Sequence, residues 1–208
     1  RMYELVAQNG AWWVYDEQVE CWYGGRSGKP QKNATVTGYY LRKYVDGSTC
    51  LKSEFVTSKR HVWNIMRYSE ILLNFAEAMV EAYGDPNYKD GYPMSAKEAV
   101  DIVRSRVHVD MPPFPNNLTL NEFKAKLRNE RRVELSFEDH RFWDIRRWKI
   151  ADQTTDIYGV DITKKEDGSF SYKKVLVEKR IFKDCMYLYP IPQSERYINP
   201  ELEQNPGW

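Results

Sequence analysis

The stretch NERRVELSFEDHRFWDIRRW, residues 129–148, concentrates five arginines, five acidic residues and four aromatic rings in twenty positions. Glu130, Glu134 and Glu138 recur every four residues, which would place them along one stripe of a helix. Like charges at that spacing oppose helix formation by about 0.2–0.5 kcal/mol per pair. The stripe therefore predicts that cations from another segment pack against it.

The residues before this stretch predict further helices. Nine apolar residues at spacings of three and four predict an amphipathic helix over 62–84: Ile65, Tyr68, Ile71, Leu72, Phe75, Ala76, Met79, Ala82 and Tyr83. That helix also carries a polar stripe of Glu70, Asn74, Glu77 and Glu81. Ser95–Glu98 and Thr119–Glu122 have the spacing of a capping box. They predict a second helix over 95–109, carried by Ala99, Val103 and Val107, and a third running from 119 into the quoted stretch. The first two helices should form a hairpin.

The flanking segments have another character. Residues 1–60 are rich in glycine and predict loops and short elements. KKEDGSFSY places Asp-Gly at the turn of a β-hairpin over 160–176. The last residues, after this hairpin, are rich in proline and predict an extended tail. The fold class is thus mainly α, with helix hairpins, long irregular loops and one small β-hairpin.

The charges of the quoted stretch have three interpretations. Ion pairs between helices are favoured, because seven arginines are available to face the acidic stripes: Arg67, Arg104, Arg106, Arg131, Arg132, Arg146 and Arg147. The second interpretation is an acid/base cluster of Glu138, Asp139 and His140, which a glycoside hydrolase could use. Adjacent helical residues point in different directions, however, and no second acid is brought to a defined distance. The third interpretation is a surface for a partner.

Composition argues against several classes of protein. A net charge of +1 argues against a nucleic-acid binder that works through a broad basic surface. Cys21, Cys50 and Cys185 are widely spaced, and the three histidines make no ligand pair, so no metal site and no cofactor are expected. The sequence contains no run of some twenty apolar residues, so no transmembrane helix is predicted.

Aromatic residues gather near the start of the chain, in AWWVYDEQVECWYGGRSG, residues 11–28. Rings that stay exposed can stack on the apolar face of a sugar, and the glycine-rich loop could supply polar groups for its hydroxyls. The alternative is that the rings fill a core beneath loops. Trp12 and Trp13 are adjacent and face differently, so at least one of them should be buried.

Four segments together resemble the SusD/RagB family: TGYYLRKYVD at 37–46, RYSEILLNFAEA at 67–78, the quoted stretch, and YLYPIPQSERYINPELEQNPGW at 187–208. They occur in order and cover roughly residues 35–208. The resemblance implies tetratricopeptide-like helix pairs, and it implies that the acidic and arginine pattern belongs to the scaffold. It also implies a non-enzymatic, surface-exposed lipoprotein of the outer membrane in Bacteroidetes. Such a protein captures a nutrient, usually a glycan or oligosaccharide, and caps a SusC-like TonB-dependent transporter.

Members of that family are usually more than twice as long as this chain. We therefore expect residues 1–208 to be a single carboxy-terminal domain, with the lipid anchor that attaches it to the membrane lying outside the chain. Its parts would be loop-rich residues 1–60, a helical scaffold over 62–151, and a hairpin with an extended tail over 152–208. Ligand loops vary within the family, and the aromatic segment lies just ahead of the scaffold match. The predicted ligand-binding residues are Trp12, Trp13, Trp22, Tyr23 and Arg26.

Other functions are compatible with the same residues. The chain could be a helical interaction domain that contacts only the transporter, or it could bind a non-glycan ligand such as a peptide. A glycoside hydrolase is the weakest alternative, because no pair of acids stands apart from the ion-pair stripes.

Overall fold

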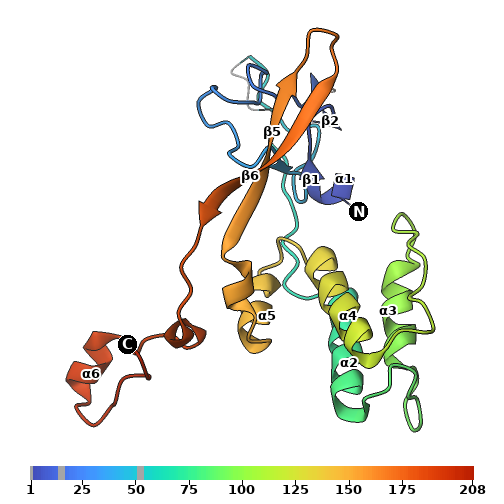
Figure 1. The fold of residues 1–208 in the computed structure, drawn as a ribbon, viewed down its shortest axis with the longest axis vertical. Coiled ribbons are helices and arrows are strands. Elements are labelled where there is room, and N and C mark those ends of the chain that lie inside the picture. The colour runs from blue at the N-terminus through green and yellow to red at the C-terminus, as the bar shows by residue number, and fades with distance from the viewer. Residues whose placement is uncertain (1, 14–16, 51–53) are drawn as a thin grey trace. The chain divides into compact units, whose positions relative to one another are not determined.

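The computed structural model describes residues 2–13, 17–50 and 54–208 of the chain (Figure 1). Tyr15, one of the clustered aromatic residues, lies outside them. The chain groups into two compact units, one built on Arg60–Arg141 and the other on Tyr3–Lys59 together with Phe142–Trp208. That residues 1–208 form a single domain stays a prediction.

The first unit contains the predicted helices. They are α2 (Tyr68–Tyr83), α3 (Ala96–Arg104) and α4 (Leu120–Glu134), and α2 contacts both α3 and α4 (Figure 1). Both capping boxes are confirmed: Ser95 and Thr119 accept hydrogen bonds from the backbone N–H three residues later, and the glutamates there accept in return. The mainly α fold class and the α2–α3 hairpin are therefore confirmed.

The core of this unit lies among the three helices. Its largest fully buried side chains are Leu73, Val80, Val100, Val103 and Phe123. Phe114, from the connection between α3 and α4, packs edge-on to Phe123 with ring centroids 5.6 Å apart. The scaffold is thus held by apolar side chains from helices that are close in sequence.

The apolar face of α2 is rotated from the prediction. Leu72, Ala76 and Met79 are buried as expected, but Tyr68 and Ile71 are exposed. The backbone at Arg67 is extended, with φ −144° and ψ 160°, so Ile65 precedes the helix and is 89% exposed. Val107 is also exposed, because α3 ends at Arg104. The spacing of apolar residues predicted these helices correctly, but it extended them beyond their observed ends.

The quoted stretch is not one continuous helix. Helix α4 ends at Glu134 and α5 (His140–Arg147) begins after a turn in which Phe137 and Asp139 have φ values of 62° and 63°. A left-handed conformation at two non-glycine residues cannot continue an α-helix. Glu138 therefore leaves the predicted helical stripe, although its side chain is still buried.

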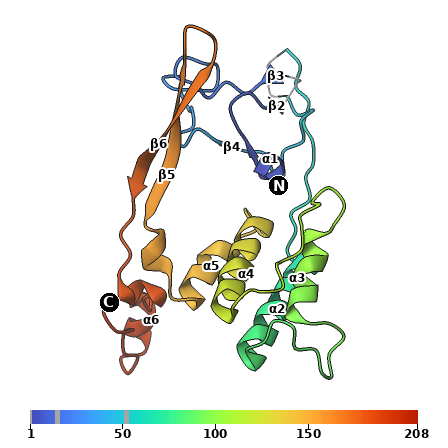
Figure 2. The same cartoon turned by 45° about the vertical axis from the view of Figure 1, so that its right-hand side comes forward.

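In the second unit the predicted hairpin is confirmed and is longer than expected (Figure 2). Strand β5 (Asp156–Lys164) pairs antiparallel with β6 (Phe170–Lys179). At the turn, Gly168 has φ +82° and Asp167 accepts a hydrogen bond from the Ser169 backbone N–H. The Asp-Gly signal thus identified the turn correctly.

Where the structure describes the loop-rich residues before α2 (2–13, 17–50 and 54–67), their elements are short. They are α1 (Met2–Leu5), β1 (Val6–Ala7), β2 (Trp12–Trp13), β3 (Glu17–Gln18) and β4 (Tyr40–Leu41). Strand β1 pairs with β4, and β2 pairs with β3. A small core of Ala7, Val19, Cys21 and Ile162 joins these loops to β5.

The chain after β6 carries η2 (Asp184–Tyr187) and α6 (Gln193–Ile198), and η1 (Ala151–Thr154) precedes β5. Side-chain amides fix the irregular tail. Gln204 exchanges two hydrogen bonds with the backbone of Ile191, and Asn205 donates to the Tyr189 carbonyl. The Trp208 indole N–H donates to the Cys185 carbonyl over 2.9 Å.

Candidate functional site

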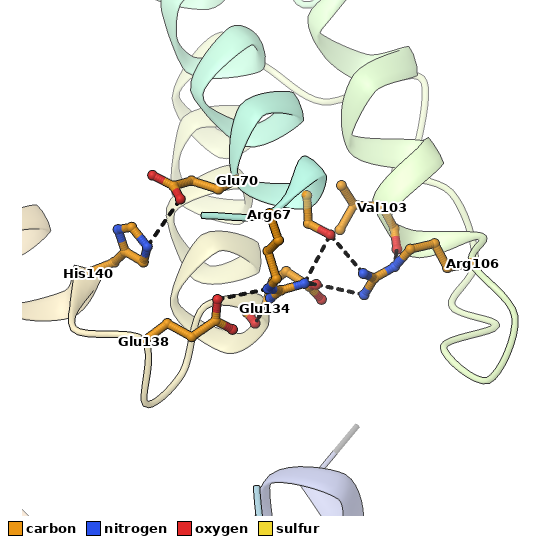
Figure 3. Close-up of polar contacts among 8 residues, drawn as sticks. Arg67, Glu70, Val103, Arg106, Glu134, Glu138 and His140 are labelled. Carbon is orange, nitrogen blue, oxygen red and sulfur yellow. Dashed lines mark hydrogen bonds and ion pairs between the residues drawn. The ribbon is translucent and has the colours of Figure 1, made fainter. Parts of the chain in front are cut away.

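Two clusters of side chains are candidates for function, and the first is the charged network around Arg67 in the helical unit (Figure 3). The Arg67 guanidinium donates to Glu138 over 2.7 Å and to Glu134 over 2.6 Å. Arg106 donates to the same oxygen of Glu134, also over 2.6 Å. Both arginines also donate to the Ser69 hydroxyl. Glu134 is therefore shared by two guanidinium groups.

Burial and charge act in opposite directions on Arg67. Burial lowers the pKa of the guanidinium, whereas hydrogen bonds from Arg67 to Glu138 and Glu134 and the charges of these carboxylates raise it by more. The net pKa lies above the usual arginine value, so Arg67 stays charged at every pH at which the protein is folded. The two carboxylates are held by a permanent cation.

Other contacts follow the same pattern. Arg104 donates a hydrogen bond to Glu130 over 2.6 Å. On the polar stripe of α2, Asn74 accepts from Arg131 and Glu81 accepts from Lys124, each over 2.6 Å. The prediction that cations from other segments pack against the acidic stripes is thus confirmed for several of the seven arginines. Arg147 instead pairs with Asp144, and Arg146 stacks on the Phe142 ring.

The proposed acid/base cluster is not assembled around a common point. Glu138 accepts from Arg67, while His140 Nε2 lies 3.4 Å from Glu70 on α2, so the two side chains meet different partners (Figure 3). An acid and a base that act on one substrate must both lie within hydrogen-bond reach of the reacting group, which these separate pairings do not favour. This geometry favours a structural role for the quoted stretch.

The second cluster is a pocket of about 280 Å³ in the other unit, where the loops before residue 39 meet strand β5. Two backbone hydrogen bonds attach the loops to this strand: Tyr23 N–H donates to the Ile162 carbonyl, and Val160 N–H donates to the Thr37 carbonyl, both over 2.9 Å. Gly38 has φ +81°, and a Cβ atom there would lie 2.5 Å from the Val160 carbonyl oxygen. The close approach of this loop to β5 therefore requires glycine.

Tyr40 forms hydrogen bonds with the same loops. Its hydroxyl donates to the Ser27 carbonyl over 2.6 Å and accepts from the Thr35 backbone N–H over 3.1 Å. The Thr35 hydroxyl in turn shares a hydrogen bond with the Thr37 hydroxyl over 3.0 Å. These contacts fix the loop that carries Thr35, Val36 and Gly38, which all line the pocket.

The lining combines apolar and polar groups. Cys21 and Ile162 are buried, and Lys29 Nζ lies 3.4 Å from Asp161 Oδ1. Burial raises the pKa of the Cys21 thiol to about 11, so the thiol is neutral and a weak nucleophile at physiological pH. The pocket is equipped to bind a polar ligand through hydrogen bonds, and its thiol is not activated for chemistry.

The predicted ligand-binding residues differ in how exposed they are and in the groups that they contact. Tyr23 lines the pocket and is 67% exposed, and Trp12, in β2, is 64% exposed. Trp13 and Trp22 are partly buried against the small core. The guanidinium of Arg26 is occupied by protein groups: Glu17 at 3.0 Å, the Gln18 carbonyl at 2.9 Å and Glu20 at 3.4 Å.

The glycine-rich loop packs on Trp22. Cβ atoms at Gly24 and Gly25 would lie 3.2 and 3.0 Å from atoms of the indole ring, and Lys164 Nζ lies 5.1 Å from its centroid. The expectation that at least one of Trp12 and Trp13 would be buried is wrong: Trp12 is exposed and Trp13 is only partly buried, because the two lie on a two-residue strand that packs on the small core from one side only. The sequence did not predict that Lys29, Thr35 and Asp161 line this pocket, because no local pattern connects residues that lie up to 132 positions apart.

In residues 2–13, 17–50 and 54–208, no three His, Cys, Asp or Glu side chains gather in a way that could hold a metal ion. Within the same ranges, no helix combines the length and the apolar character that crossing a membrane requires.

Comparison with known proteins identifies the family. The chain is 28% identical to SusD-like protein P2 of Formosa agariphila over 148 residues, which are 69% of this chain and 25% of that protein. A solved SusD-like protein of Bacteroides fragilis matches with a TM-score of 0.82 and 28% identity, over 99% of this chain and 38% of the other. A SusD superfamily protein of Bacteroides vulgatus shares the fold alone, with a TM-score of 0.59 and 20% identity, over 100% of this chain and 39% of the other.

The chain thus spans between a quarter and two fifths of the length of these relatives. The sequence profile of the SusD family matches residues 1–208. The resemblance noted in the four segments is therefore confirmed over the whole sequence, and the chain belongs to the SusD family.

Proposed function

We propose that the protein binds a nutrient glycan at the cell surface, without catalysis, and delivers it to a SusC-like TonB-dependent transporter of the outer membrane. The observation that carries the proposal is the match of the SusD family to residues 1–208. The membrane attachment would be a lipid anchor. The ligand site would be the pocket between the early loops and β5, with Tyr23 at its edge.

Two features of the pocket support sugar binding. The exposed Tyr23 ring offers a flat apolar surface and a phenolic hydroxyl, which suit the C–H face and the hydroxyls of a sugar. The loops are already fixed on β5 by backbone hydrogen bonds, so little conformational entropy is lost when a ligand binds. Trp12 is a second exposed ring of the same unit and extends the set of candidate contacts.

The ion-pair network supports the absence of catalysis. Glu130, Glu134, Glu138 and Asp144 are each bound by an arginine. Glu138 and His140 meet different partners. A hydrolase that used this cluster would release reducing sugar and would lose that activity in Glu138→Gln. We expect no release of reducing sugar by either protein, measured over an overnight incubation.

Isothermal titration against a panel of soluble polysaccharides and oligosaccharides tests the binding proposal. We expect saturable binding of one sugar class, weakened about tenfold or more by Tyr23→Ala. Tyr172→Ala is the matched control, because Tyr172 is an exposed tyrosine of the same unit that lies on β6 and does not line the pocket. Equal binding by wild type and Tyr23→Ala would place the site elsewhere.

The partly buried Trp22 needs a separate readout. Because Gly24 and Gly25 pack on its ring, Trp22→Ala should lower the melting temperature as well as the affinity. Tyr23→Ala should lower affinity with little change in melting temperature. If no glycan binds while the SusC-like transporter still co-purifies with the protein, the protein serves the transporter alone.

A further inference from the structure

We infer that the pocket selects an uncharged sugar residue, through two neighbouring hydroxyl groups, over uronate or sulfated sugars. The inference rests on the proposed function and adds the chemical class of the ligand. Its central element is the pair formed by Lys29 and Asp161, which line the pocket from segments 132 residues apart in sequence.

The size of the pocket limits what enters it. Clefts that enclose drug-sized ligands have volumes of roughly 300–1,000 Å³, and this pocket, at about 280 Å³, falls just below that range. It therefore accommodates one sugar ring more readily than several. Any remaining rings of an oligosaccharide would lie outside it, where Tyr23 is exposed.

The lining offers complementary groups for hydroxyls. Asp161 accepts hydrogen bonds only, and Lys29 donates only. Their charged atoms are 3.4 Å apart, and adjacent hydroxyl oxygens of a sugar ring are separated by roughly 3 Å, about the length of a hydrogen bond. One hydroxyl can thus donate to Asp161 while its neighbour accepts from Lys29, and both bonds are strengthened by the charge of the protein group.

The same pair disfavours an anionic sugar. A carboxylate or sulfate that approached Lys29 would also meet Asp161, which is close enough to oppose it. The anionic group of the sugar would have to compete with Asp161 for the Lys29 ammonium group. Two neutral hydroxyl groups can instead bind Lys29 and Asp161 at the same time. Lys173 stands opposite Asp161 in the β5–β6 ladder but does not line the pocket. The lining itself therefore holds one cation and one anion, and no net charge.

Apolar and hydroxyl groups complete the site. Ile162 and Cys21 are buried residues of the lining, and Val36 adds an exposed apolar side chain. Thr163 adds a residue whose hydroxyl can donate or accept, whereas the Thr35 hydroxyl is already engaged by Thr37. This combination suits a ring with C–H faces and hydroxyl edges.

The test is isothermal titration of the protein with neutral gluco-, manno-, galacto- and xylo-oligosaccharides, and with oligogalacturonate, oligoalginate and a sulfated galactan. The variants are Lys29→Gln and Asp161→Asn, with Lys173→Gln as the control lysine outside the pocket. Lys29 and Asp161 are about half exposed, with side-chain exposures of 47% and 55%, so both substitutions should leave the fold intact. Melting temperatures check this.

We expect a neutral oligosaccharide to bind, with affinity falling about tenfold in Lys29→Gln and in Asp161→Asn and unchanged in Lys173→Gln. Asp161→Asn leaves Lys29 without its opposing anion, so binding of the uronate probe should rise relative to wild type. Neutral binding that is indifferent to both pocket variants would overturn the inference.

Tighter binding of an acidic glycan by the wild type, lost in Tyr23→Ala, would also overturn the inference but would leave the proposed function standing. If the protein binds no oligosaccharide of the panel, the proposed function fails and the inference fails with it.

Discussion

Replacing Glu134 by glutamine tests whether the charged network in the quoted stretch stabilises the helical unit. The glutamate side chain is 5% exposed, and one of its oxygens accepts from both Arg67 and Arg106 at 2.6 Å. Glutamine keeps the shape and one acceptor oxygen but removes the charge. Two guanidinium groups would then remain close together, with Glu138, which pairs with Arg67, as a nearby carboxylate.

The size of the loss follows from burial. Removing one partner of a buried ion pair costs about 3–5 kcal/mol, because the other charge stays buried without compensation. The Arg106 side chain is 38% exposed and that of Arg67 is 23% exposed, so water recovers part of the cost. We therefore expect a loss of about 3 kcal/mol in the free energy of unfolding.

Glu81→Gln is the matched control. Glu81 pairs with Lys124 at the same 2.6 Å distance, but its side chain is 49% exposed, and exposed pairs contribute about 0.2–1 kcal/mol. Urea unfolding followed by far-ultraviolet circular dichroism at 222 nm would measure both variants. With a slope of ~1–3 kcal/mol per M, Glu134→Gln should move the midpoint by about 1 M or more. Equal midpoints for the two variants would refute the argument that burial decides the strength of these pairs.

Three further predictions concern the core, the pocket and acid stability. Phe123→Ala should lower the free energy of unfolding by about 3–5 kcal/mol, because the ring is fully buried, and a loss below ~1 kcal/mol in urea unfolding would contradict the described packing. Gly38→Ala should cost at least ~1–2 kcal/mol, since its φ is +81° and the new Cβ would lie 2.5 Å from the Val160 carbonyl oxygen, and it should also weaken glycan binding in the same titrations. Hydrogen bonds from the Thr119 hydroxyl and backbone N–H lower the pKa of Glu122. A lowered folded-state pKa contributes stability at neutral pH that is lost as the pH falls through it, so Glu122→Gln should flatten the acid side of a plot of melting temperature against pH, and an unchanged slope would contradict this role.

Local patterns predicted much of the fold. The capping boxes at Ser95 and Thr119 placed the starts of α3 and α4, and Asp-Gly placed the turn between β5 and β6. Each of these signals depends on three or four neighbouring residues, so it can be recognised without knowing how the rest of the chain folds. The break at Phe137–Asp139 was missed because its left-handed residues are not glycines, and their cost is met by contacts elsewhere, including that of Glu138 with Arg67.

The helices of the scaffold, the hairpin, the need for cations against the acidic stripes and the resemblance to the SusD family can all be predicted from the amino-acid sequence. Which arginine meets which glutamate depends on packing between distant segments. The same packing holds Arg26 on Glu17 and Glu20 and places Tyr23 in the lining of a pocket. The same holds for Lys29 and Asp161, which come together because loops and strand β5 are joined by backbone hydrogen bonds and a shared small core. Local signals depend on backbone geometry within a few residues, whereas such pairs depend on how distant segments pack.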